Sequence, residues 1–186
     1  METRILGVDI AGNPFKWLSA EEAVHYYASE KVVWDLGAEL QVFHGGFQNT
    51  GIQSLISLKS IVAVRGETKR VYNKSTINTQ GNHLLFRRDH HICAYCGLYF
   101  ESKDLTRDHV HPRSRGGSND WINSVSACKH CNMKKADRTP EEAGMHLLYV
   151  PYRPCRWEHF ILQNRNVISD QMDYLRAKLP KHSRYS

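Results

Sequence analysis

Four cysteines in two Cys-x-x-Cys pairs constrain this chain more than any other feature. The pairs are Cys93-Ala-Tyr-Cys96 and Cys128-Lys-His-Cys131. Two clips of this spacing supply the four thiolates that a tetrahedral structural zinc ion requires. We therefore expect one zinc ion held by Cys93, Cys96, Cys128 and Cys131. A zinc ion closed by four thiolates has no open coordination position, so any reaction must belong to other groups.

The rest of the composition is typical of a globular protein. The chain has 186 residues, of which 41% are hydrophobic, enough for one sizeable domain or two small ones. No apolar run approaches the ~20 residues of a membrane span, and the start Met-Glu-Thr-Arg lacks a signal-peptide pattern. We expect a cytoplasmic location with no membrane partner. In that reducing compartment the paired cysteines are metal ligands, and Cys155 is a packed thiol.

Between and beside the clips lie polar residues that can do chemistry. Asp108-His109 precedes a loop with Pro112 and two glycines, and Asn132 directly follows the last cysteine. An imidazole has a pKa close to working pH and can take a proton from water. Carboxylate and amide oxygens suit Mg²⁺ far better than thiolates do. We expect His109 to be a general base, and Asp108 with Asn132 to hold one catalytic cation, Mg²⁺ or Mn²⁺.

The order of these residues resembles the HNH endonuclease family, also called the ββα-metal or His-Me finger family. The resemblance covers residues 88 to 140, with His109 at the first signature position, Asn123 at the middle one and Asn132 at the last. Many members have His at the last position, and Asn is a variant that keeps an oxygen ligand. The resemblance implies DNA cleavage leaving a 5′-phosphate and a 3′-hydroxyl. It also implies that Asn123 forms hydrogen bonds across the loop and so holds the segment that carries His109. The spacing alone does not distinguish this role from that of an ordinary turn asparagine.

Strand geometry sets one condition on this site. Adjacent residues of a regular strand point to opposite faces, so Asp108 and His109 serve one site only at a strand end or an irregularity. The nearby loop at Pro112 makes such a strand end plausible. A strand over 105–111, a returning strand over 123–127 and a helix over 129–137 give the ββα arrangement that the resemblance requires.

The expected fold class is α+β, in three segments. Residues 1–80 form a small α+β region that packs on the core or contacts substrate, 81–140 the zinc-stabilised nuclease module, and 141–186 a C-terminal helical extension. The local patterns predict strands over 4–10, 31–36, 39–43 and 60–64, a polar loop over 44–53 and a linker over 66–82. They also predict helices over 19–30 and 84–89, a helix start at Thr139-Pro-Glu-Glu142, and a packing helix with apolar residues at 168, 172, 175 and 179.

Basic residues are concentrated around the metal motif. The net charge is +6, and residues 81–140 hold ten basic and six acidic side chains, whereas residues 1–80 hold eight of each. A basic surface attracts a polyanion through phosphate contacts and counterion release. We expect DNA as the partner, with phosphate contacts from six residues: Arg113, Arg115, Lys129, Lys134, Lys135 and Arg138.

Two interpretations of the whole chain stay open at this stage. The first is a metal-dependent endonuclease with His109 as general base. The second is a non-catalytic zinc-ribbon module that binds DNA or RNA. The sequence leaves the oligomeric state open, with a homodimer as one option, and does not choose among restriction, homing, repair and phage processing.

Overall fold

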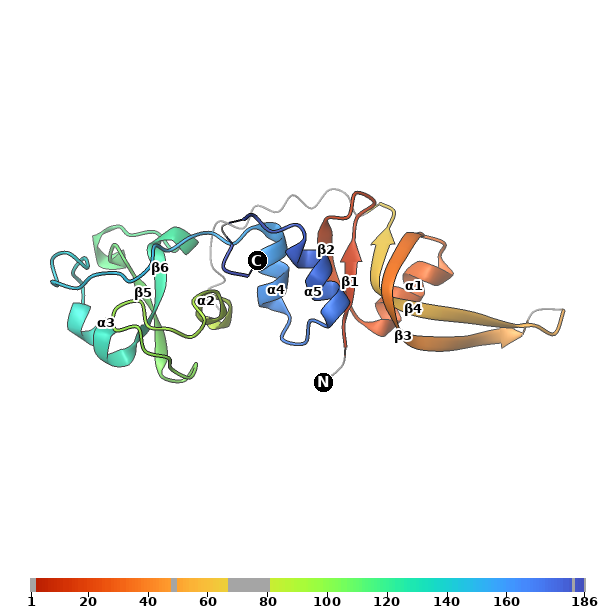
Figure 1. Ribbon diagram of the computed structural model, residues 1–186, viewed down its shortest axis with the longest axis horizontal. Coiled ribbons are helices and arrows are strands. Elements are labelled where there is room, and N and C mark those ends of the chain that lie inside the picture. The colour runs from red at the N-terminus through yellow and green to blue at the C-terminus, as the bar shows by residue number, and fades with distance from the viewer. Residues whose placement is uncertain (1–2, 48–49, 67–80, 182, 186) are drawn as a thin grey trace. The chain divides into compact units, whose positions relative to one another are not determined.

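The computed structural model describes residues 3–47, 50–66, 81–181 and 183–185. These residues form six strands, five α-helices and two short 3-10 helices, which confirms the expected α+β class (Figure 1). The chain divides into two compact units. One unit combines Met1–Tyr72 with Cys155–Ser186, and the other is Asn73–Pro154. Among the described residues, no helix combines the length and the hydropathy that a membrane span requires.

The first unit is built on a four-stranded sheet with the order β2-β1-β4-β3. Strand β1 (Ile5–Val8) lies in the middle, antiparallel to β2 (Pro14–Leu18) and parallel to β4 (Gln53–Val64). Strand β3 (Val32–Phe47) pairs antiparallel with β4 along almost its whole length. Figure 1 shows the β3 and β4 strands continuing as a long hairpin.

Helices cover both faces of this sheet, because its central strands carry apolar residues on both sides. Helix α1 (Ala20–Ala28) buries Ala23 in a cluster that includes Ile5 and Val62. The neighbouring residues Leu6 and Ile61 point the other way, into a cluster with residues of α4 (Arg156–Gln163) and α5 (Ser169–Arg176). The C-terminal helices therefore belong to the same compact unit as the N-terminal sheet. The sequence had suggested a separate segment over 141–186 instead.

Helix α1 begins where its capping pattern predicts. The Ser19 hydroxyl accepts a hydrogen bond from the Glu22 amide at 3.2 Å, and the Glu22 carboxylate accepts one from the Ser19 amide at 3.1 Å. This reciprocal pair satisfies two backbone donors that an uncapped helix would leave without partners. The expected helix over 19–30 is thus confirmed, with its end at Ala28.

Several strand expectations for this unit were wrong in detail. The two short strands expected over 31–36 and 39–43 are one strand, β3. The expected polar loop over 44–53 is only partly a loop, because residues 44–47 belong to β3 and Gln53 begins β4. Strand β2 was not anticipated, because Pro14 at its first residue and Lys16 at its centre obscure the alternating pattern. Most of the linker expected over 66–82 lies outside the described residues.

The second unit contains the ββα arrangement. Strands β5 (Leu105–His109) and β6 (Ser124–Cys128) form an antiparallel pair whose register runs from Leu105 opposite Cys128 to His109 opposite Ser124. Helix α3 (Lys129–Lys135) follows β6 directly, and helix α2 (His83–Arg88) precedes the first cysteine clip. Two 3-10 helices, η1 (Arg113–Arg115) and η2 (Trp121–Asn123), lie in the loop between the strands.

The helix expected to start at Thr139 does not form. The capping contacts are present, since the Glu142 amide donates to the Thr139 hydroxyl at 3.3 Å and the Thr139 amide donates to the Glu142 carboxylate at 3.0 Å. The segment is nevertheless only a turn, which ends at Gly144 with φ +63°. A capping box satisfies the first amides of a helix but does not supply the buried apolar face that a short helix needs.

Candidate active site and metal centre

The four paired cysteines converge on one point in the second unit. Their Sγ atoms all lie within 4.8 Å of one another, and three of the four residues are buried while Cys96 is exposed. The first clip turns tightly, with the Gly97 amide donating to the Cys93 carbonyl at 3.0 Å and Gly97 at φ +74°. In the second clip, Cys128 ends β6 and caps α3, where its Sγ accepts from the Cys131 amide at 3.4 Å.

This cluster fits a structural metal ion such as zinc. Zinc–sulfur bonds of about 2.3 Å in a tetrahedron place the sulfurs roughly 3.8 Å apart, within the limit observed here. Burial raises the pKa of Cys96 and Cys131, so bare thiolates are disfavoured at these positions. A dication would offset that cost, because metal-bound thiols lose their protons. The cluster is also the only group of three or more His, Cys, Asp or Glu ligands among the described residues.

A buried ion pair, Arg88 with Asp89, joins helix α2 to strand β6 in this unit. Arg88 and Asp89 are both almost fully buried, and the Arg88 Nε lies 2.7 Å from the Asp89 carboxylate. The guanidinium also donates to the carbonyl oxygens of Trp121 and Ser124, at 2.7 and 2.8 Å. Asp89 accepts from the Ser126 amide at 2.8 Å. Helix α2 is thereby fixed to β6, whose end carries Cys128.

Asp108 and His109 lie at the end of β5 and line one pocket of about 290 Å³. The other walls of this pocket come from η1 and from α3, including Asn132 and Lys135. The strand pairing is regular through His109, and the two side chains make different contacts, Asp108 with Lys135 of α3 and His109 with the loop that follows β5. Both residues reach the same pocket at the end of β5, where the sequence analysis expected a shared site to require a strand end.

His109 contacts a residue that the sequence analysis did not single out. Its Nε2 lies 3.1 Å from the Asn119 Oδ1, and the same oxygen accepts a hydrogen bond from Arg107 Nη1 at 2.9 Å. Burial, and then the charge of Arg113, lower the pKa of Arg107. Asn119 and Asn123 lie in the same loop between η1 and β6, and nothing in the local sequence distinguishes Asn119 from an ordinary loop asparagine.

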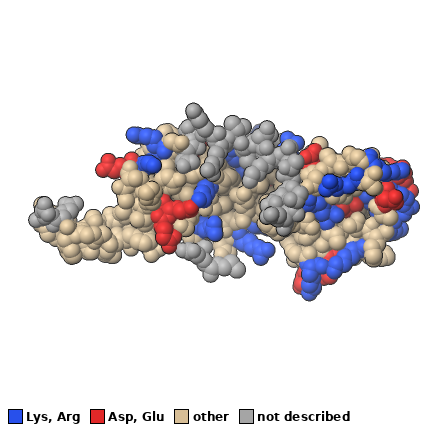
Figure 2. All heavy atoms as spheres, turned by 180° about the vertical axis from the view of Figure 1, so that it is seen from behind, with Lys and Arg blue, Asp and Glu red and all other residues tan. Residues whose placement is uncertain are grey.

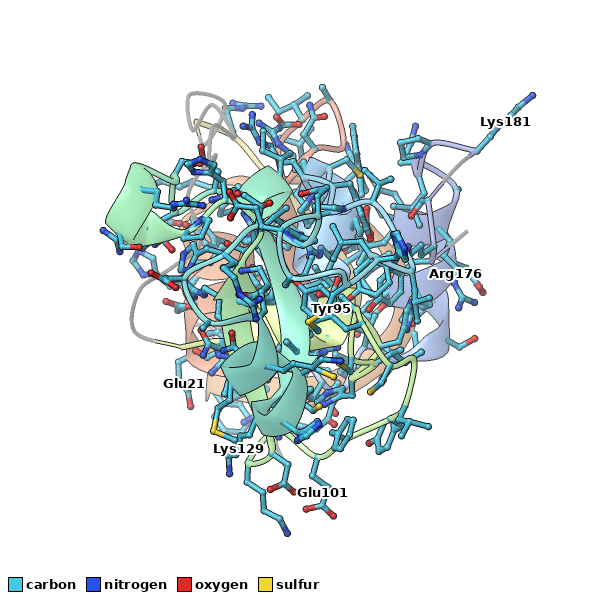
Figure 3. All side chains as sticks on the ribbon, turned by 90° about the vertical axis from the view of Figure 1, so that its left-hand side faces the viewer. Glu21, Tyr95, Glu101, Lys129, Arg176 and Lys181 are labelled. Carbon is cyan, nitrogen blue, oxygen red and sulfur yellow. The ribbon has the colours of Figure 1, made fainter. Side chains whose placement is uncertain are left out.

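Asp108 is buried and both of its carboxylate oxygens are hydrogen-bonded. Lys135 Nζ donates to Oδ1 at 2.9 Å, and the Tyr95 hydroxyl donates to Oδ2. Burial and then the Asp108 contact raise the pKa of Tyr95, which keeps the phenol protonated as the donor. Figure 3 labels Tyr95 beside the yellow sulfur atoms of the module. The phenol of Tyr95 thus connects the first cysteine clip to the end of β5.

Asn132 extends from α3 toward β5. Its Nδ2 donates to the Thr106 hydroxyl at 2.9 Å, and that hydroxyl donates to the Ala127 carbonyl at 3.0 Å. Because the amide nitrogen is used in this way, the amide oxygen of Asn132 is the group available to a cation. The clip at Cys131 sets the position of Asn132 through the start of α3.

Asn123 makes three hydrogen bonds across the loop between β5 and β6. Its Oδ1 accepts from the His111 amide at 2.8 Å, and its Nδ2 donates to the carbonyls of His111 and Ser118, at 3.0 and 2.8 Å. These bonds join the chain just after His109 to the chain just before Asn119. No bond between the Asn123 side chain and His109 itself is found among the described residues.

Five of the six expected phosphate contacts are exposed: Arg113, Arg115, Lys129, Lys134 and Arg138. Arg115 pairs with Glu142, and Lys129, which points outward in Figure 3, lies 3.5 Å from Asp104. Figure 2 shows Lys and Arg gathered over the unit formed by residues 81–154. Lys135 departs from the expectation, because it is 1% exposed and donates to Asp108 and to the His109 carbonyl. Its ammonium is turned inward and is not a surface phosphate contact.

Comparison with known proteins agrees with the site. Residues 93–148 match the family model described as HNH endonuclease. The matched range begins at Cys93 and contains both cysteine clips, Asp108, His109, Asn123 and Asn132. No curated protein matches the chain.

Proposed function

We propose that this chain, which carries an HNH endonuclease domain at residues 93–148, is a metal-dependent endonuclease that hydrolyses DNA phosphodiester bonds. One observation carries the proposal. Asp108, His109 and Asn132 line a single pocket of about 290 Å³, next to a four-cysteine cluster and inside the matched domain. A structural zinc module by itself would not need these three groups in one place.

The proposed reaction is the attack of a water molecule on the phosphorus of a phosphodiester. The His109 imidazole takes the proton of the water as its oxygen forms the new bond to phosphorus. The bond from phosphorus to the 3′ oxygen breaks, and that oxygen leaves with the electron pair and gains a proton from solvent. The products are a 5′-phosphate and a 3′-hydroxyl, as in the family that the site resembles.

Asp108 and Asn132 are the residues that would hold the catalytic Mg²⁺ or Mn²⁺. A carboxylate offers about four lone-pair sites, of which Tyr95 and Lys135 use two, so Asp108 keeps acceptor capacity toward the pocket. The amide oxygen of Asn132 adds a second oxygen donor. When bound, such a cation stabilises the negative charge that develops on the phosphoryl oxygens.

Exposed cations near the pocket suit the proposed DNA substrate. Arg113 lines the pocket, while Lys134 and Arg138 are exposed at the end of α3. Such residues position a phosphate backbone without reading its sequence. We infer that they orient the scissile phosphate against His109.

One observation favours the second candidate, a non-catalytic zinc module that binds DNA or RNA. The Asp108 carboxylate is already neutralised by a buried ammonium, that of Lys135, and so has no need of a cation. In that case the pocket would bind a phosphate without breaking a bond.

Nicking of supercoiled plasmid separates the two candidates. We expect the zinc-loaded full chain to convert supercoiled DNA to open circles in Mg²⁺ or Mn²⁺, and to stop when those cations are left out. Mobility-shift assays on the same DNA measure binding in parallel. Binding without any cleavage across both cations would establish the binding module and refute the nuclease.

A further inference from the structure

Three side chains form a hydrogen-bonded chain that ends on the proposed general base. Arg107 Nη1 donates to Asn119 Oδ1 at 2.9 Å, and the same oxygen lies 3.1 Å from His109 Nε2. Arg107 and His109 belong to β5, whereas Asn119 belongs to the loop that precedes η2. The sequence separates Asn119 from His109 by a loop, so only the folded chain brings them together.

The guanidinium fixes which end of the Asn119 amide faces His109. A guanidinium has donors and no acceptor, so the atom of Asn119 that faces Arg107 is the oxygen rather than the amino group. An amide oxygen can only accept. The ring nitrogen that contacts it, Nε2 of His109, must therefore be the donor and carry the hydrogen.

This hydrogen decides which nitrogen of His109 acts as the base. In a neutral imidazole one nitrogen carries a hydrogen and the other carries a lone pair. With the hydrogen on Nε2, the lone pair lies on Nδ1. We propose that Asn119 and Arg107 are positioning residues that hold His109 in the Nε2-H form, so that Nδ1 receives the proton of the attacking water. This inference rests on the proposed endonuclease function for its catalytic consequence but not for the tautomer itself.

The side chain of Asn123 fixes the position of the loop around Asn119. Asn123 donates to the carbonyl of Ser118, the residue before Asn119, and to the carbonyl of His111, two residues after His109. The backbone on both sides of the His109–Asn119 contact is thereby tied to one side chain. Asn123 thus acts on His109 indirectly, through the placement of Asn119.

Nitrogen-15 NMR of the histidine side chains tests the tautomer without using activity. Long-range proton–nitrogen spectra of the zinc-loaded full chain, recorded at about pH 8 where an ordinary imidazole is neutral, distinguish the protonated ring nitrogen from the bare one. The His109→Ala variant identifies the His109 signals by their loss. We expect wild-type His109 in the Nε2-H form and Asn119→Ala to give a mixture of the two forms. Asn166→Ala, the same side-chain change in the other compact unit, should leave the His109 signals unchanged.

Kinetics then test the consequence for catalysis. Asn119→Ala should lower the single-turnover rate about 10-fold with DNA affinity unchanged, because the ring loses its fixed orientation and fewer molecules hold the base in the productive form. Asn119→Gln, which keeps an amide oxygen, should recover part of the loss. A wild-type His109 in the Nδ1-H form, or the same tautomer in Asn119→Ala as in wild type, would overturn the proposal. A chain that never cuts but shows the expected tautomers would refute the nuclease function alone.

Discussion

The ammonium of Lys135 lies 2.9 Å from the carboxylate of Asp108, and the side chains of the two residues are 1% and 4% exposed. The same ammonium donates to the His109 carbonyl at 2.8 Å. Helix α3, which begins at the second cysteine clip, is therefore joined through its last residue to the end of β5. The metal centre and the proposed catalytic residues form one connected structure.

Removal of the Lys135 ammonium should destabilise the module strongly. Lys135→Met leaves the buried Asp108 carboxylate without its cation, and breaking a buried pair in this way costs about 3–5 kcal/mol. Urea unfolding of the zinc-loaded protein, followed by tryptophan fluorescence, measures the change in the free energy of unfolding. Lys134→Met, at the exposed neighbouring position, is the matched control and should change it by less than about 0.5 kcal/mol. Equal effects of the two variants would mean that Lys135 is a surface cation, as the sequence suggested.

Zinc should be bound at one ion per chain and be coupled to folding of the module. Cys128→Ser removes one thiolate ligand, while the serine hydroxyl still caps α3, so we expect loss of the metal and of the melting transition of residues 81–154. Elemental analysis and calorimetry measure the two losses. Cys155→Ser lies outside the cluster and should leave both quantities as in wild type. Full zinc content in Cys128→Ser would contradict the four-cysteine site.

Binding to duplex DNA should weaken steeply as salt is added. The logarithm of the binding constant falls with the logarithm of salt concentration by about 0.9 for each phosphate neutralised. Arg113→Ala and Lys134→Ala should each reduce that slope by about one phosphate, because both side chains are exposed and Arg113 lines the pocket. Fluorescence anisotropy across a salt series gives the slope, with Lys181→Ala in the other unit as control. A salt-independent affinity would argue for a partner other than a polyanion.

Asn132→Ala should lower the cleavage rate, and a higher Mg²⁺ concentration should restore part of that rate. Loss of the amide oxygen removes one proposed cation ligand, so the rate should saturate at higher Mg²⁺ and recover in part at saturation. Asn132→Asp keeps an oxygen donor and should be milder. Single-turnover nicking across a Mg²⁺ titration compares the two variants. An unchanged half-saturation concentration in Asn132→Ala would remove Asn132 from the cation site.

Local sequence signals predicted those parts of the fold that depend on neighbouring residues. The Ser19–Glu22 capping box located α1, and the Cys-x-x-Cys spacing located the metal cluster. The Thr139–Glu142 box shows the limit of such signals, since the same contacts formed without a helix. A cap completes a helix that packing stabilises, and packing is not a local property.

The buried charges could not be predicted from the sequence, because nothing local distinguishes a buried cation from a solvated one. Arg88 and Lys135 are both buried and both donate to groups distant in the sequence, and Lys135 was therefore assigned to the surface. Asn119 escaped notice for the same reason. Asn119 is of interest because its side chain contacts His109, and that contact forms only when the loop between β5 and β6 folds back.

We propose that His109 removes the proton from water in a DNA-cleaving site, and the His109→Ala variant isolates this role. The measurement is the single-turnover rate of plasmid nicking in saturating Mg²⁺, with zinc content and DNA affinity determined on the same samples. Loss of a general base should lower the rate by about 10²- to 10⁴-fold. Zinc content and affinity should remain near wild type, because His109 belongs to neither the thiolate cluster nor the exposed cations. A His109→Ala protein that nicks plasmid at the wild-type rate would show that His109 is not the general base.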